Sequence, residues 1–199
     1  MDELQYYNDT AQPPKNNRKA LKYVIIAAVV IGLLIFIFPP LYLHTTSLKL
    51  YPAYRAITSI HRNIREPDWF SDFAEDVEND FAFDYMPSMM QGTGHYSVRF
   101  RTSPEKAREY AERFAEQARY EFLLSQYSDS AWTSVRDLGY DAPENKDSIL
   151  IFRDTDFWSG HEETAKVYVI DAVLDWNHPH SSAIIVDEEA GMVELSQLG

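Results

Sequence analysis

The chain has 199 residues and a mass of 23.1 kDa, enough for one domain of ordinary size with an appendage. Hydrophobic residues make up 45% of it, which excludes a wholly disordered chain. The net charge of −13 argues against a nucleic-acid-binding surface. The lack of cysteine excludes disulfides, thiolate metal sites and cysteine nucleophiles. The mean hydropathy of −0.37 is typical of a soluble protein, but it averages over two unlike parts of the chain.

The most distinctive segment is an apolar run near the N-terminus. From Tyr23 to Leu43 the sequence contains no charged and no amide side chain. A helix of this length is roughly 30 Å long, the thickness of the hydrocarbon core of a bilayer. We therefore predict a transmembrane helix over residues 21–43, which Pro39 and Pro40 would bend or end near the interface. The alternative is a buried core helix, which would normally carry a polar stripe.

A cleaved signal peptide is a second alternative for this run. The run is longer than the apolar core of such a peptide, roughly 7 to 15 residues, and no cleavage pattern of small residues follows it. The sequence therefore favours an uncleaved signal-anchor, and the lipid bilayer is the expected partner of residues 21–43.

The distribution of basic residues predicts the orientation of this anchor. The denser group of basic residues precedes the run, and a more widely spaced group follows it: Lys15, Arg18, Lys19 and Lys22, then Lys49, Arg55 and Arg62. The denser group is expected to stay in the cytoplasm. Residues 1–20 are then a flexible cytoplasmic tail, 44–66 a juxtamembrane helical segment, and 67–199 an extracytoplasmic domain. A domain that faces the cytosol is the alternative.

The source of the chain can also be inferred. An exported eukaryotic domain usually carries cysteine or a glycosylation site. This chain has no cysteine, and its one N-x-S/T triplet, Asn8 to Thr10, falls in the predicted cytoplasmic tail. A single-pass protein of a bacterial cell membrane fits these observations better.

The rest of the chain predicts an α+β fold. Helical spacing of apolar residues indicates helices over 53–64, 68–80 and 104–124, and the last begins with a strong N-cap signal at Thr102 to Glu105. Residues 95–101 alternate between apolar and polar, as a half-buried strand does. Further strands are predicted at 148–153, 166–174, 182–186 and 192–197. Helices come first and strands follow, so we expect an antiparallel sheet of four or five strands packed on one main helix.

One group of residues suggests metal chemistry. Asp175, His178 and His180 lie close together in a turn-rich segment and could hold a divalent cation. Exposed turn residues would have the same composition, and this is the simpler interpretation. The segment that begins Asp154-Thr155-Asp156 resembles the opening of a calcium loop, but Trp158 and Ala165 occupy positions that need oxygen ligands. We therefore expect no bound cofactor.

Two further surfaces are candidates for contact with a partner. The predicted helix at 68–80 has an acidic face that includes Asp72, Glu75 and Asp76. The segment after it is rich in aromatic residues and methionine, which suits an adaptable apolar contact. Its candidate contact residues are Tyr85, Met86, Met89 and Met90. The alternative is that this segment covers the sheet as part of the core.

These features favour a non-catalytic binding, sensing or complex-assembly module, anchored by one membrane helix and working with a protein partner at the membrane. The sequence contains no Ser-His-Asp, HExxH or GxSxG pattern. The alternative function is a membrane-tethered, metal-dependent hydrolase that uses Asp175, His178 and His180.

Overall fold

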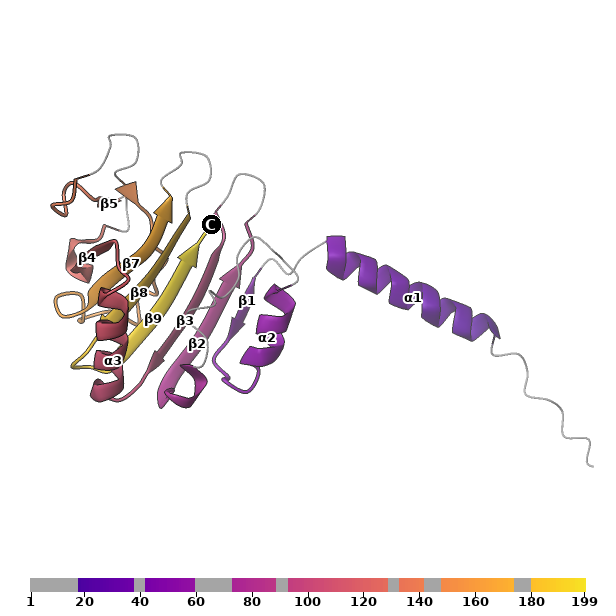
Figure 1. Cartoon of the computed structure of the whole chain (residues 1–199). Helices are drawn as coiled ribbons and strands as arrows, with labels where there is room; N and C mark the ends of the chain where they lie inside the picture. The colour runs from indigo at the N-terminus through magenta and orange to yellow at the C-terminus, as the bar shows by residue number, and fades with distance from the viewer. Residues whose placement is uncertain are drawn as a thin grey trace, which may run out of the picture. The chain divides into compact units, whose positions relative to one another are not determined.

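The computed structural model describes residues 18–37, 42–59, 73–88, 93–128, 133–141, 148–173 and 180–199 (Figure 1). The chain divides into two compact units, residues 1–39 and 40–199. In the first unit, helix α1 covers Arg18–Ile37. Its described large apolar side chains, from Leu21 to Ile31, are each about half exposed or more. Within the described residues, no helix has both the length and the apolar character that crossing a membrane requires.

The second unit is built on a sheet of seven antiparallel strands. Its spatial order is β1 (Leu43–Thr45), β2 (Asn79–Met86), β3 (His95–Arg101), β9 (Met192–Leu198), β8 (His180–Asp187), β7 (Lys166–Val173) and β4 (Tyr120–Leu123). A separate pair, β5 (Thr133–Ser134) and β6 (Ser148–Ile149), forms a small second sheet. The predicted α+β class and antiparallel sheet are confirmed, and the sheet is larger than predicted.

The additional strands replace parts of predicted helices. In the described part of the helix predicted over 68–80, the chain forms a 3-10 turn, η2 (Phe73–Glu75), and then β2 from Asn79, because Phe81, Phe83 and Tyr85 alternate with period two. Residues 60–72 lie outside the described residues. The predicted helix at 104–124 ends at Ala115, and the chain reverses to form β4, which pairs with β7.

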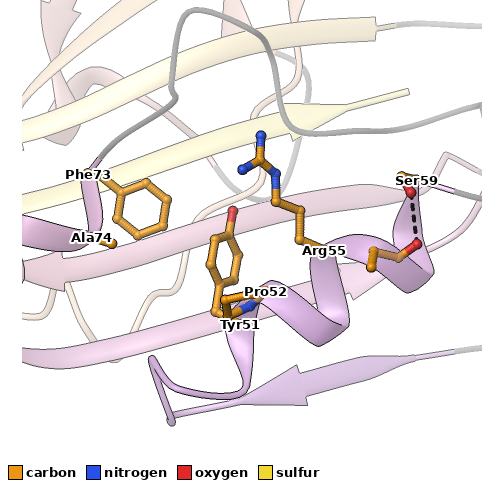
Figure 2. Close-up of a pocket in the computed structure, with 7 residues that line it drawn as sticks. Tyr51, Pro52, Arg55, Ser59, Phe73 and Ala74 are labelled. Atoms are coloured by element: carbon orange, nitrogen blue, oxygen red, sulfur yellow. Dashed lines mark hydrogen bonds between the residues drawn. The ribbon is translucent and has the colours of Figure 1, made fainter.

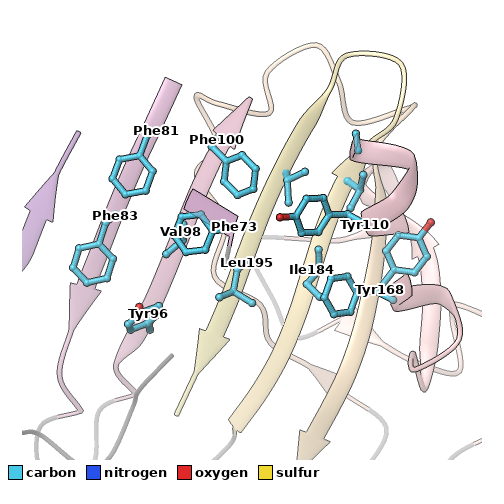
Figure 3. Packing of buried hydrophobic residues seen from close by; sticks show 14 of the residues in the cluster. Phe73, Phe81, Phe83, Tyr96, Val98, Phe100, Tyr110, Tyr168, Ile184 and Leu195 are labelled. Atoms are coloured by element: carbon cyan, nitrogen blue, oxygen red, sulfur yellow. The ribbon is translucent and has the colours of Figure 1, made fainter. Parts of the chain in front are cut away.

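Helices cover one face of the sheet. Helix α2 (Tyr51–Thr58), η2 and α3 (Pro104–Ala115) pack there against apolar side chains from alternate strand positions (Figure 3). Helix α3 begins as the sequence predicts: the Ser103 hydroxyl accepts a hydrogen bond from the Lys106 backbone N–H at 3.2 Å. The strand residues of this core include Phe81, Phe83, Tyr96, Val98, Phe100, Leu195, Ile184 and Tyr168.

The opposite face of the sheet has two unlike halves. Over β7, β8 and the start of β9 it is apolar, and residues from the 120–158 region and the small sheet cover it. A short 3-10 turn, η3 (Leu124–Gln126), belongs to this cover. Over β1, β2, β3 and the centre of β9 the same face is polar. We call this half the polar face; its side chains are His44, Asp84, Ser97, Arg99, Arg101 and Glu194.

Candidate functional site

The predicted metal ligands are placed only in part. His180 is the first residue of β8, and its Nε2 lies 3.6 Å from Asp171 Oδ2, with both side chains nearly half exposed. Asp175 and His178 lie outside the described residues. Across the parts of the chain that are described, no three His, Asp or Glu side chains gather closely enough to hold a metal ion.

The predicted acidic contact face is likewise only partly described. Asp72 lies outside the described residues, and Glu75 is exposed at the end of η2. Asp76 is half-buried and accepts a hydrogen bond from the Tyr110 hydroxyl at 2.8 Å. Lys106 Nζ approaches the same carboxylate at 3.7 Å. Asp76 therefore fastens α3 to the chain before β2, in addition to any contact with a partner.

The predicted apolar contact segment becomes the C-terminal part of β2. Tyr85 points into the core and is fully buried, which excludes it from any exposed contact surface. Met86 points to the other face and is 38% exposed. Met89 and Met90 lie outside the described residues. The alternation of a strand thus splits a segment that the composition had suggested to be one surface.

The polar face begins at the edge of the sheet with a cluster around Asp84. His44, Asp84 and Ser97 are in register across β1, β2 and β3. Asp84 Oδ1 lies 2.8 Å from His44 Nδ1 and accepts a hydrogen bond of 2.5 Å from the Tyr42 hydroxyl. The carboxylate therefore holds two side chains from the start of β1.

The centre of the polar face contains a fully buried carboxyl group. Glu194 on β9 lies directly across from Arg99 on β3 and has no exposed surface. It accepts hydrogen bonds from Ser97 Oγ at 2.7 Å, from Trp158 Nε1 at 2.5 Å and from the Asp154 backbone N–H at 3.2 Å. Burial raises its pKa from 4.5 to about 7, although these hydrogen bonds oppose the shift. Glu194 therefore ties the loop at 154–158 to the sheet.

A hollow of about 580 Å³ opens beside Glu194. We call it the arginine pocket; it is lined by Thr46, Asp80, Ala82, Arg99, Arg101, Asp156 and Phe157, with Phe81. The small side chain of Ala82 lies beside Arg99 in the strand register and leaves space there. The pocket thus combines parts of β2 and β3 with a loop that is more than 50 residues away in the sequence.

The two arginines that name this pocket share one aromatic ring. The guanidinium carbons of Arg99 and Arg101 lie 4.9 Å and 5.8 Å from the centre of the Phe157 ring. Arg99 also forms an ion pair of 2.7 Å with Asp154, and Arg101 Nε donates to Asp80 Oδ2 at 2.9 Å. Asp80 has φ of 51°, in the left-handed region, at an irregularity in the β2–β3 pairing. This unfavourable backbone geometry places its carboxylate beside Arg101.

A second hollow, of about 410 Å³, lies on the helix-covered side of the sheet (Figure 2). One wall is α2, with Tyr51, Pro52, Arg55, Ala56 and Ser59, and the other is Phe73 and Ala74 of η2. The chain that connects these two walls, residues 60–72, lies outside the described residues. The lining of this second hollow carries fewer charged groups than that of the arginine pocket, and it therefore offers fewer contacts to a polar ligand.

The polar face carries groups that can recognise charge. Arginine side chains form bidentate ion pairs with carboxylates, and stacking on an aromatic ring fixes the orientation of the guanidinium group. The His44–Asp84 pair resembles the base and its orienting carboxylate in a catalytic triad. Among the described residues, no serine or threonine hydroxyl is hydrogen-bonded to His44 to complete such a triad.

None of the site residues predicted from the sequence lines the arginine pocket. The alternation in 95–101 had placed Ser97, Arg99 and Arg101 together on one face of a strand. The local sequence does not indicate that four other residues lie near this strand: Glu194 on β9, and Asp154, Asp156 and Phe157 in the loop. The signal that was available is the pair of arginines two residues apart on one strand in a strongly acidic chain. Comparisons with known protein families, with curated proteins and with solved structures found no match for this chain.

Proposed function

We propose that this chain is a single-pass membrane-anchored protein whose α+β unit is a non-catalytic binding module, with the arginine pocket as its binding site. The N-terminal tail lies in the cytoplasm and the chain from residue 44 onwards lies outside it, at a bacterial cell membrane. Two sets of observations support the proposal, one for the anchor and one for the pocket.

The anchor rests on the composition and exposure of the N-terminal helix. The predicted span, 21–43, has no charged residue from Tyr23 onwards. The side chains of Ile25, Ile26 and Val29 are each more than half exposed on α1. Exposed apolar surface on a helix is unfavourable in water and favourable in lipid. We therefore propose that the bilayer covers this helix.

The binding role rests on one observation above all. In a chain of strongly negative net charge, two arginine side chains line one pocket of about 580 Å³. Volumes of this size are usual for small-molecule sites, which typically measure about 300 to 1,000 Å³. The ion pairs with Asp154 and Asp80 and the contact with Phe157 fix both arginines before any ligand arrives. A preorganised site of this kind loses less entropy on binding.

The same geometry favours binding over catalysis. Glu194 has the perturbed pKa that is typical of catalytic acids, but it has no exposed surface and cannot touch a ligand. The metal-dependent hydrolase requires Asp175 and His178 beside His180, and Asp175 and His178 both lie outside the described residues. No observation therefore favours the hydrolase over the binding module.

A protein partner at the membrane is also part of the proposal. From residue 44 onwards the chain has 28 acidic and 14 basic residues. Anionic lipid headgroups repel such a unit, so we expect it to stand away from the bilayer surface. The partner would carry complementary basic charge, because like charges across an interface are costly.

A thermal-shift comparison tests the pocket. The purified full-length chain in detergent is heated with acetate, glycine, inorganic phosphate or spermidine, and the same is done for Arg99→Gln/Arg101→Gln. We expect at least one compound to raise the melting temperature of the wild type and not of this variant. The matched control is Arg108→Gln/Arg119→Gln, which removes the same charge from exposed positions and should keep the shift. Equal shifts in all three proteins would contradict the proposal.

Labelling in intact cells tests the anchor. The chain has no cysteine, so single replacements at Asn8 and at the exposed Glu105 report each side of the membrane without background. An impermeant maleimide should label position 105 and leave position 8 unlabelled until the cells are opened. The opposite pattern would show that the domain faces the cytosol, and release of the chain by alkaline carbonate would show that it is not embedded in the bilayer.

A further inference from the structure

The arginine pocket carries charges of both signs, which limits the kind of ligand that fits it. We infer that the pocket binds a small zwitterion of amino-acid or dipeptide size, with its carboxylate on Arg99 and its ammonium group on Asp156. This inference rests on the proposed function, because it names the ligand of the same pocket.

The carboxylate is assigned to Arg99 because of its unused donors. One terminal nitrogen of its guanidinium pairs with Asp154 at 2.7 Å. The Arg99 side chain lines the pocket and is 21% exposed, and its other terminal nitrogen has no hydrogen-bond partner among the described residues. A carboxylate is the acceptor that fits a guanidinium best. A ligand carboxylate at this position would therefore form a new ion pair with a guanidinium that Asp154 already orients.

The loop that carries Asp154 keeps Arg99 in position for this contact. Asp154 Oδ1 accepts hydrogen bonds from the backbone N–H groups of Asp156 and Phe157, both at 3.0 Å. Its Oδ2 pairs with Arg99, and its own N–H donates to Glu194. Each polar group of this aspartate is thus engaged, so the residue supports the pocket and does not compete as a free anion inside it.

The ammonium group is assigned to Asp156, the acidic residue of the lining whose carboxylate has no ion-pair partner among the described residues. Asp156 is exposed on the pocket wall, and no described residue forms an ion pair or side-chain hydrogen bond with its carboxylate. Asp80, the other acidic residue of the lining, is already paired with Arg101 at 2.9 Å. A cationic group of the ligand would therefore form its ion pair with Asp156 and not with Asp80.

The lining carries charges of both signs, which favours a ligand that also carries both. Two arginines and two aspartates line the pocket, and Asp154 pairs with Arg99 from outside the lining. A dianion such as phosphate would be attracted by the arginines and repelled by both aspartates. A simple cation would be attracted by the aspartates and repelled by the arginines. A zwitterion can satisfy both signs. Ala82 leaves space between the charged walls for an aliphatic part.

Calorimetric titration of the full-length chain in detergent separates these possibilities. The three probes are L-alanyl-L-alanine, its N-acetyl derivative without the ammonium group, and its amide without the carboxylate. We expect the free dipeptide to bind at least about tenfold more tightly than either derivative, as the loss of one charged hydrogen bond implies. Asp156→Asn should weaken the dipeptide about tenfold and leave the N-acetyl derivative unchanged. Arg99→Gln should weaken both, and Arg108→Gln is the charge-matched control.

The outcomes distinguish this inference from the proposed function. If the N-acetyl derivative binds as tightly as the dipeptide and depends on Arg99, the zwitterion is overturned and the binding site stands. If no probe binds and the thermal-shift panel also gives no Arg99-dependent shift, both fall. Asp156 is exposed, so Asp156→Asn is expected to fold even if Arg99→Gln loosens the loop, and its melting temperature verifies this.

Discussion

Replacing Glu194 with glutamine should flatten the pH dependence of stability. The pKa of Glu194 is raised from 4.5 to about 7 in the folded protein. Between these two values the folded state keeps a proton that the unfolded state has released, so the free energy of unfolding falls as pH rises. This contribution is fully present below the unfolded pKa and is lost as pH rises through the folded pKa.

The size of the effect follows from the two pKa values. Integrating the linkage between pH 5 and pH 8 gives a loss of about 2.5 kcal/mol in the free energy of unfolding, all from this one carboxyl group. Glutamine does not ionise, so the variant should lack this loss. Its amide keeps an oxygen that can accept from Trp158 or the Asp154 backbone N–H, and its amide nitrogen can donate to Ser97.

Urea denaturation at pH 5, 6, 7 and 8, followed by tryptophan fluorescence, measures the effect. The difference in stability between Glu194→Gln and the wild type should move in favour of the variant by about 2.5 kcal/mol from pH 5 to pH 8. Glu189→Gln is the control, because Glu189 is exposed in the turn before the same strand. Parallel pH profiles for the wild type and Glu194→Gln would refute the reasoning, because Glu194 would then have the same pKa folded and unfolded.

Two further substitutions and a titration with zinc test other parts of the account. Gly191→Ala should destabilise the chain by about 2 kcal/mol or more in urea denaturation, because φ is 63° and a Cβ there would lie 2.1 Å from the Thr102 carbonyl oxygen; an unchanged midpoint would contradict this. Asp187→Asn should cost about 2 kcal/mol at pH 7, through its contacts with His161, Thr164 and Ala190. Burial raises the pKa of Asp187, but those contacts together have the larger effect and hold it below its usual value of 3.8. The difference in stability between the wild type and Asp187→Asn should therefore shrink as pH falls through the folded pKa. A stability difference that is constant down to pH 2 would be evidence against this. Titration with zinc should show no micromolar binding in calorimetry, whereas binding that His180→Ala abolishes would support the metal-dependent hydrolase.

Elements with strong local signals were predicted well. The strand at 95–101 matches β3 in full, and the N-cap at Ser103 begins α3 as expected. The strands β7, β8 and β9 were found with small errors at their ends. In each case the alternation or the cap chemistry lies within a few residues and needs no distant contact.

Two of the strands that the sequence did not predict, β2 and β4, were missed because one local pattern fits both a helix and a strand. Phe122 continues the helical spacing of Phe114 and Ala118, although the chain turns before it and pairs β4 with β7. Phe81 extends the apolar stripe of a helix and also begins the alternation of β2. Pairing with neighbouring strands decides between the two, and a single sequence does not show those neighbours.

The candidate site shows the same limit. Glu194 alternates with Val193 and Leu195 as any outward-facing strand residue would, and Trp158 buries it from a loop 36 residues earlier in the chain. Asp154 and Asp156 looked like a failed calcium loop. Their position beside Arg99 arises only when that loop folds over β3 and β9. Burial and partnership across the sheet are tertiary properties, so they follow from the fold and not from the spacing of residues.

The most direct test of the arginine pocket is a titration followed by NMR of the arginine Nε–H groups. L-alanyl-L-alanine is added to the ¹⁵N-labelled chain, and the signals of Arg99, Arg101, Arg108 and Arg119 are compared. The proposed function and its ligand predict saturable shifts for Arg99 and Arg101 and none for Arg108 and Arg119, which lie outside the pocket. Shifts of equal size in all four signals, or in none, would contradict the claim that this pocket is the binding site for a small zwitterion.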